Sequence, residues 1–249
     1  MFLDINELSK SYGNEKVLDK LNFAVEEHYT LSILGKSGCG KTTLLKIIAG
    51  LLQPDKGSIS LKGNNVTNLK PEERYFVYMY QEALLFPHLD VFENIAFGLR
   101  VRKMSEQVIK EKTHAMIHQL ELDGMQEKMP HQLSGGQKQR VAFGRAIIVN
   151  PEILLLDEPF ANLDTSTRRR MQQLFKRMVH EKGITSLFVT HNLKEAILMG
   201  DDIATLKSGQ LHKYDSINAF IRNRETGVQD EIAFWESLKK DVRNNYNDQ

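Results

Sequence analysis

Short apolar runs at the start of the chain alternate with turn residues and predict β-strands. "FLDINEL", "LNFAV" and "YTLSIL" are rich in branched and aromatic residues, and Gly13-Asn14 supplies a turn between the first two. The next run, "TTLLKIIAGLL" over 42–52, is apolar on nearly every face, which predicts a buried helix that ends before Pro54. "GSISLKGNN" then predicts a strand followed by a turn.

In the middle of the chain the apolar positions change to helical spacing. Within "MSEQVIKEKTHAMIHQLELDG" they recur at steps typical of one helix face, with Ser105 placed as an N-cap and Gly124 as a stop. Because this helical section separates two strand-bearing blocks, we expect an inserted helical subdomain over about residues 82–148.

Two continuous apolar runs follow, "EILLLD" (Glu152–Asp157) and "SLFVT" (Ser186–Thr190), with the helical pattern "TRRRMQQLFKRMVHEKG" between them. Strand, helix and strand at this spacing predict a βαβ unit with buried parallel strands. The chain becomes polar after Phe220. We therefore expect one main domain over residues 1–220 and a short helical tail over 221–249.

Composition narrows the function classes. The formal net charge of the 249 residues is +1, so no overall field attracts nucleic acid. Cys39 is the only cysteine, which excludes a disulfide within the chain and suits a reducing compartment. The N-terminal residues lack a secretory pattern, and no window reaches the roughly 18 apolar residues of a membrane span. We therefore expect a chain that does not itself cross a membrane.

"GKSGCGKTT" (Gly35–Thr43) follows a predicted strand and opens the predicted buried helix, and it matches the phosphate-loop pattern G-x-x-x-x-G-K-[ST]. Its glycines let backbone N–H groups turn toward a phosphate chain, and the helix N-terminus adds positive partial charge. Lys41 can reach the β- and γ-phosphates, and the Thr42 hydroxyl can hold Mg²⁺. For Cys39, a small residue that packs is favoured over a redox switch. The predicted ATP contacts in this loop are Gly35, Lys36, Ser37, Gly38, Cys39, Gly40, Lys41, Thr42 and Thr43.

Polar side chains also follow the predicted parallel strands, at the edge where ligands bind in α/β sheets. Asp157 can hold Mg²⁺ there, which leaves Glu158 free to polarise an attacking water. His191 follows the next strand and can donate to a γ-phosphate, although a structural role is equally compatible with its position. The neutral side-chain amide of Gln81 can contact a bound metal ion and water without adding charge. Tyr12 can stack on an adenine or simply pack beside a turn.

"LSGGQKQR" (Leu133–Arg140) stands far from the phosphate loop. Ser134 and Gln137 have the spacing of a capping box, so a helix is expected to begin here. Gly135 and Gly136 remove side chains from its first turn and leave N–H groups exposed to an anion. Because the phosphate loop already cradles one triphosphate, a second anion surface is useful if it faces a phosphate held by another copy of the chain.

Together these motifs resemble the ABC-family ATPases, over roughly the first 210 residues and in the family's order. "GKSGCGKTT" resembles the Walker A loop, "ILLLDEP" the Walker B strand and "LSGGQKQR" the signature motif. Gln81 falls at the Q-loop, "ANLD" with Asp164 at the D-loop, His191 at the switch histidine and Tyr12 at the stacking aromatic.

The resemblance implies an α/β fold: a P-loop NTPase with a RecA-like mixed or parallel sheet core, an N-terminal antiparallel β subdomain and an inserted α-helical signature subdomain. It implies a head-to-tail homodimer, or a pair with a similar ATPase, around two ATPs with Mg²⁺. Glu158, His191 and Gln81 are then catalytic, and Thr42, Gln81 and Asp157 hold the metal. The residues expected to contact ATP across the dimer are Ser134, Gly135, Gly136, Gln137 and Asp164.

Three positions depart from the usual family pattern. Asn192 stands where an Asp usually follows the switch histidine, Asn162 replaces a common D-loop Ala, and Gly144 replaces a common Ala after the signature. None removes a catalytic group, so hydrolysis is still expected. Unless packing compensates, Gly144 should loosen its helix by about 1 kcal/mol relative to Ala.

"QEALLFPHLDVFENIAFGL" resembles bacterial importer ATPases of the sulfate, iron, polyamine and sugar group. In that group this segment receives the permease, so Phe86, Pro87 and His88 are the expected permease contacts. The hypothesis is an importer subunit, cytoplasmic and peripheral on the inner face of the cell membrane, that works with integral membrane permease subunits and binds no nucleic acid. An exporter ATPase, a soluble ABC ATPase acting on nucleic acid or ribosomes, and a non-hydrolysing binding module remain as alternatives.

Overall fold

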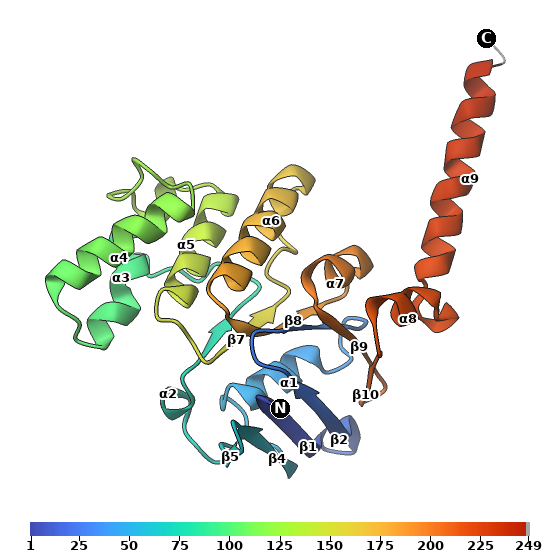
Figure 1. The fold of residues 1–249 in the computed structure, drawn as a ribbon, viewed down its shortest axis with the longest axis horizontal. Helices are drawn as coiled ribbons and strands as arrows, with labels where there is room; N and C mark the ends of the chain where they lie inside the picture. Colours follow the sequence, from blue (N-terminus) through green and yellow to red (C-terminus); the bar gives the residue numbers. More distant parts are fainter. Residues whose placement is uncertain (248–249) are drawn as a thin grey trace.

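A computed structural model describes the backbone of residues 1–247 and the side chains of residues 1–237. Its strands form two sheets (Figure 1). The first is antiparallel in the order β2-β1-β4-β5, and comprises β1 (Leu3–Tyr12), β2 (Glu15–Val25), β4 (Lys56–Leu61) and β5 (Asn64–Asn65). The second has the order β10-β9-β3-β8-β7-β6, and comprises β3 (Thr30–Leu34), β6 (Phe76–Met79), β7 (Ile153–Asp157), β8 (Thr185–Thr190), β9 (Asp202–Lys207) and β10 (Gln210–Lys213).

In the second sheet all neighbours are parallel except the edge strand β10. The helices are α1 (Lys41–Ile48), α2 (Pro71–Arg74), α3 (Val91–Val101), α4 (Glu106–Gln119), α5 (Gly135–Ile147), α6 (Thr165–Glu181), α7 (Leu193–Met199), α8 (Ile217–Arg222) and α9 (Val228–Asn247). Between β6 and β7 the chain forms a lobe of α3, α4 and α5, and α9 projects from the opposite side of the molecule (Figure 1). The mixed α/β fold with an antiparallel N-terminal sheet is confirmed, whereas the boundaries at residues 82, 148 and 220 stay predictions.

The central strands separate two hydrophobic cores. Side chains along a strand alternate between its faces, and on β7 Leu154 and Leu156 pack with the helical lobe while Ile153 and Leu155 pack with α1 and the antiparallel sheet. Asp157 continues the second set, so its carboxylate emerges on the face that carries α1. This alternation places the end of β7 beside the phosphate loop.

Two helices end earlier than the sequence pattern predicts. Helix α1 ends at Ile48 rather than near residue 52, because Gly50 adopts a φ of 80° and Leu51 N–H bonds back to Lys46 O. Helix α4 ends at Gln119 rather than at Gly124, because Glu121 adopts a φ of 55° and closes the helix first. Ser105 occupies the N-cap of α4, but its side chain makes no capping hydrogen bond.

Gly144 lies where α5 packs most closely on its neighbours in the lobe. An added Cβ would overlap with Leu120 Cδ1 and lie 3.4 Å from atoms of Ile95 and Met116. An alanine would therefore have to displace buried side chains, which typically costs 1–3 kcal/mol, or about as much as its helix propensity gains. Close packing thus offsets the loosening expected from this glycine.

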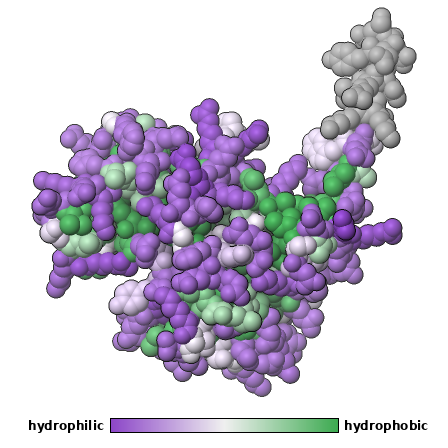
Figure 2. Space-filling view, in the orientation of Figure 1, coloured by the Kyte–Doolittle hydropathy of each residue, from purple (hydrophilic) through white to green (hydrophobic). Residues whose placement is uncertain are grey.

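The surface is mostly polar, with apolar areas over the lobe and near α7 and α8 (Figure 2). Among the residues that the structure describes, none of the helices combines the length and apolar character required to span a membrane.

A buried arginine closes the C-terminal end of α1. Arg74, only 1% exposed, donates to the carbonyls of Ile47 and Ile48 and to those of Thr67 and Leu69. The last carbonyls of a helix lack intrahelical partners, so this guanidinium satisfies groups that would otherwise be buried without a donor. It holds the helix whose other end forms the phosphate loop.

Replacing Arg74 with Met should lower the free energy of unfolding by about 3 kcal/mol, because several buried carbonyls lose their donor while the volume is largely kept. Urea denaturation measures the change. The Arg74→Lys control retains a charge but reaches fewer carbonyls, so it should fall between Met and wild type. Equal stability of the Met variant and wild type would contradict this role.

Candidate functional site

A cavity of about 470 Å³ opens at the carboxyl-terminal edge of the parallel sheet. Its lining residues come from the phosphate loop, the start of α1, the carboxyl ends of β6, β7 and β8, and the start of β2: Val17, Ser37, Gly38, Gly40, Lys41, Thr42, Thr43, Gln81, Asp157, Glu158 and His191. Every member of this set except Val17 was predicted from the sequence. The structure therefore brings together residues that are more than 150 positions apart in the chain.

Some predicted contacts lie outside the wall of this cavity. Tyr12 is 51% exposed at the end of β1, and Val17 rather than Tyr12 lines the cavity on that side. Gly35, Lys36 and Cys39 do not line the cavity either. A Cβ on Gly35 would lie 2.6 Å from Cys39 Sγ, and Cys39 packs against the core, which favours its packing role.

The phosphate loop curls around the N-terminus of α1. Gly40 is the N-cap of this helix with a φ of 106°, a conformation that side chains disfavour. Lys41 is 5% exposed, and its Nζ donates to Gly35 O at 2.7 Å and to Lys36 O at 3.0 Å. The ammonium is also 3.4 Å from Glu158 Oε1. A positive charge and a helix N-terminus thus meet at the mouth of the loop, an arrangement that binds phosphate.

Asp157 ends β7 as a buried carboxylate with both oxygens in contact. Thr42 Oγ1 donates to Oδ1 at 3.1 Å, and the hydroxyl of Tyr78 donates to Oδ2 at 2.7 Å. Burial, and then the bond to Asp157, raises the pKa of Tyr78 well above its usual range, so the hydroxyl keeps its proton. Sequence reasoning missed Tyr78, because this residue belongs to none of the motifs.

The donor set of Asp157, Thr42 and Gln81 suits Mg²⁺ better than a softer metal. All three side chains offer oxygen atoms, which are the ligands Mg²⁺ prefers. Among the described residues no group of three or more His, Cys, Asp or Glu side chains could hold a metal by itself. Mg²⁺ usually binds through one or two carboxylates together with substrate phosphates and water, so the single carboxylate of Asp157 is compatible with this ion.

Glu158 and His191 form a close pair at the cavity wall. Glu158 Oε2 lies 2.7 Å from His191 Nδ1, and Glu158 has a φ of 47°, which is unusual for a residue with a side chain. Its backbone N–H bonds to Val189 O at 3.1 Å, which fixes this turn against β8. This turn holds the carboxylate beside the ring of His191 at the cavity wall.

Hydrogen bonds of the residues on both sides of His191 in the chain fix its backbone. Asn192 is the N-cap of α7 and accepts hydrogen bonds from the N–H groups of Lys194 and Glu195. An Asn at this position therefore caps the helix as an Asp would. The buried Glu195 accepts from Thr190 Oγ1 at 2.8 Å and from Gln172 at 3.2 Å, so it ties β8 to α6.

The signature segment lies outside the cavity of its own chain. Ser134 and Gln137 form the predicted capping box: Gln137 N–H donates to Ser134 Oγ at 3.3 Å, and Ser134 N–H donates to Gln137 Oε1 at 2.9 Å. Gly135 is exposed, and a Cβ there would meet no atom within 4 Å. The exposed Asp164 caps α6, and its bonds to Thr167 and Ser166 hold the pKa of this carboxyl below its usual range.

The loop with Phe86, Pro87 and His88 is fastened to the helical lobe. Asn94 of α3 accepts from Phe86 N–H at 2.9 Å and donates to Phe86 O at 3.1 Å. Arg145 of α5 lies 4.7 Å from the Phe86 ring and donates to Leu84 O. Pro87 and His88 are exposed. Sequence reasoning missed Asn94 and Arg145, because both contacts depend on tertiary packing.

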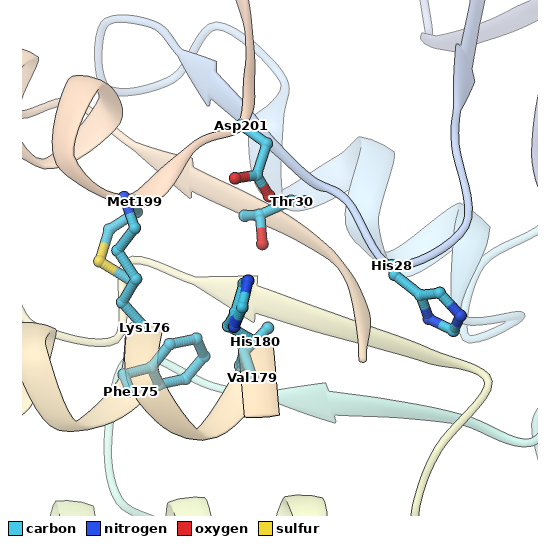
Figure 3. A pocket seen from close by; sticks show the side chains of 8 residues that line it. All are labelled: His28, Thr30, Phe175, Lys176, Val179, His180, Met199 and Asp201. Atoms are coloured by element: carbon cyan, nitrogen blue, oxygen red, sulfur yellow. Dashed lines mark hydrogen bonds between the residues drawn. The ribbon is translucent and has the colours of Figure 1, made fainter. Parts of the chain in front are cut away.

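A second pocket at the opposite edge of the sheet carries no comparable chemistry. Its volume of about 30 Å³ is enough for roughly one water. Asp201 accepts from Thr30 N–H at 2.8 Å, Lys176 donates to Leu198 O at 2.8 Å, and the His28 ring turns away from the other side chains (Figure 3). Asp201 and Lys176, the two charged groups here, are thus occupied by structural contacts.

Comparison with known proteins gives consistent matches. The ABC transporter family model matches residues 18–161. The spermidine/putrescine import ATP-binding protein PotA of Haemophilus influenzae is 42% identical over 209 residues, which cover 84% of this chain and 56% of the relative. The molybdate/tungstate import ATP-binding protein WtpC of Pyrococcus horikoshii is 44% identical over 209 residues, which cover 84% of this chain and 60% of the relative. The chain thus spans little more than half the length of these relatives.

A solved structure has the same fold. The dimeric, post-hydrolysis structure of the ATP-binding cassette MJ0796 bound to ADP and Pi aligns with a TM-score of 0.75 and 32% identity, covering 85% of this chain and 98% of that one. The family model spans more than half of the present sequence, and its range includes the phosphate loop, the signature segment and the carboxylates that end β7. The chain belongs to the ABC transporter family.

Proposed function

We propose that this chain is the ATP-binding and ATP-hydrolysing subunit of a membrane importer, which dimerises around two ATPs and acts on separate permease subunits. The observation that carries this proposal is the cavity that joins the phosphate loop to Asp157, Glu158, His191 and Gln81. The relatives named above are import ATP-binding proteins, which favours import over export. Because one is named for polyamines and the other for oxyanions, the cargo stays open.

Each group in the cavity has a distinct task in this function. Lys41 and the N–H groups of the loop bind the β- and γ-phosphates, and Thr42, Asp157 and Gln81 hold Mg²⁺, which neutralises charge on the phosphates. Glu158 accepts a proton from the attacking water. His191, which touches Glu158 Oε2, orients that carboxylate and can donate to the γ-phosphate.

The second copy supplies what one chain lacks. Ser134, Gly135 and Gly136 form a capped helix N-terminus that lies outside the cavity of their own chain. A γ-phosphate held by a partner suits this surface, with Gln137 and Asp164 beside it. ATP then stabilises the closed dimer because it contacts both copies only in that state, and hydrolysis releases it.

The permease-facing surface is the loop of the half-buried Phe86 and the exposed Pro87 and His88. Phe86 packs on Phe97 at 4.4 Å between ring centroids, and Leu84 beside it is 53% exposed. An aromatic and apolar surface on a fastened loop is typical of a binding site for a protein partner. A permease held there places the chain on the cytoplasmic face of the membrane.

The Glu158→Gln variant should lose about 10²–10⁴-fold in ATP turnover, because the amide cannot accept the proton from water. Steady-state phosphate release measures this loss, and filter binding should show that ATP still binds. The matched control is Glu152→Gln at the opposite end of β7, where the carboxylate pairs with Lys62 at the surface. Unchanged turnover in Glu158→Gln would rule out Glu158 as the base.

The Phe86→Ala variant should lose most of its association with the membrane complex, since the aromatic contact and the packing of the loop are removed together. Tagged variants are extracted from native membranes in mild detergent, and the proteins that co-purify are identified. Tyr29→Ala, at an exposed aromatic position away from this loop, is the control.

A polytopic membrane protein bound to wild type and Tyr29→Ala, but not to Phe86→Ala, is the expected result. Recovery of ribosomes or nucleic acid in its place would support the soluble ABC ATPase class and overturn the importer assignment.

A further inference from the structure

We propose that Tyr78 is a positioning residue for the metal ligand Asp157: its hydroxyl occupies one carboxylate oxygen and leaves the other for the cation. The inference rests on the proposed Mg²⁺-ATP function of the cavity. It assigns a role to a side chain that lies outside the cavity wall and that none of the sequence motifs includes.

The register of the sheet brings the two side chains together. Strands β6 and β7 are parallel with Tyr78 opposite Leu155, and Asp157 follows Leu155 on the same face. The Tyr78 side chain therefore lies beside β7 and reaches forward to its last residue, where the hydroxyl meets Asp157 Oδ2 at 2.7 Å. A bond of this length between a hydroxyl and a carboxylate is short and charge-assisted.

The two oxygens of Asp157 have different neighbours. Oδ2 accepts from Tyr78, whereas Oδ1 accepts from Thr42 Oγ1 at 3.1 Å, the side chain expected to share the metal. Without the Tyr78 bond the carboxylate could rotate about its terminal torsion, which is a soft one. Tyr78 thus keeps Oδ1 turned toward Thr42, and partners of this kind orient ligands and raise metal affinity.

The same residue links the metal ligand to the Q-loop. Strand β6 ends at Met79, and Gln81 follows two residues later in the cavity wall. The Tyr78 ring also packs against Tyr80 with 4.5 Å between centroids. The bond to Asp157 therefore fixes the end of β6, from which the segment with Gln81 begins. Two proposed Mg²⁺ ligands, Asp157 and Gln81, thus depend on the hydroxyl of Tyr78.

The test compares Tyr78→Phe with Tyr80→Phe, each in the full chain carrying Glu158→Gln so that hydrolysis is slow. Both variants lose one tyrosine hydroxyl and keep the ring, but only Tyr78 bonds Asp157. Binding of a fluorescent ATP analogue is titrated with Mg²⁺ and also measured in EDTA. Thermal unfolding checks that the variants remain folded.

For Tyr78→Phe, the Mg²⁺ concentration that half-saturates nucleotide binding should rise about tenfold, while affinity in EDTA changes by less than about twofold. Tyr80→Phe should match the parent. In an Asp157→Asn background the effect of Tyr78→Phe should disappear, because the bond acts through that carboxylate.

An unchanged Mg²⁺ requirement, or equal weakening with and without Mg²⁺, would overturn the positioning role while leaving the ATPase assignment intact. If the parent itself shows no Mg²⁺-dependent nucleotide binding, the proposed function fails and this inference fails with it.

Discussion

The structure depends on the parallel register of the central sheet. Because β3, β6, β7 and β8 run in the same direction, their carboxyl ends meet at one edge. The phosphate loop follows β3, Gln81 follows β6, Asp157 ends β7, and His191 follows β8. No loop has to be long to gather these side chains, and the buried strands hold them against α1, whose C-terminal end Arg74 closes.

A second consequence of this arrangement is that the site is divided. The cavity collects the phosphate loop, Asp157 and Glu158, yet the capped N-terminus of α5 lies outside it. The N-terminus of α1 opens into the cavity and that of α5 does not, which is the arrangement expected if another copy completes the site as proposed. The same helix α5 carries Arg145, which holds the loop of Phe86. Movement of the signature segment would therefore reach the proposed permease surface through one rigid element.

Sequence reasoning found the elements and most of the cavity because these depend on local rules. The phosphate loop, the βαβ unit and the Ser134 capping box are encoded over short segments, and the structure forms each of them. The ends of α1 and α4 were misplaced because Gly50 and Glu121 adopt left-handed conformations that compete with the apolar pattern.

The pattern of apolar and polar residues along the chain could not predict contacts between residues that are distant in the sequence. Tyr78 meets Asp157 across 79 positions, and Arg145 meets Leu84 across 61. Neither pair has a sequence signature, because each depends on how strands and helices pack. Gly144 shows the same limit. Helix propensity alone predicts that this glycine destabilises α5, whereas the structure shows that Leu120 leaves no room for a larger side chain.

The most direct test of a site shared between two copies is a mixing experiment with Lys41→Ala and Ser134→Arg. Each variant alone should be inactive, since each damages both sites of its own dimer. If Ser134 acts on the partner's ATP, mixed dimers contain one intact site, and the mixture should regain about a quarter of wild-type ATP turnover.

The control mixture of Lys41→Ala with Glu158→Gln should regain no ATP turnover. Lys41 and Glu158 both line the cavity of their own chain, so each site of a mixed dimer still contains one of the two changes. Recovery in the first mixture alone would support the shared site. A Ser134→Arg variant that is active by itself, or a first mixture that stays inactive, would contradict it.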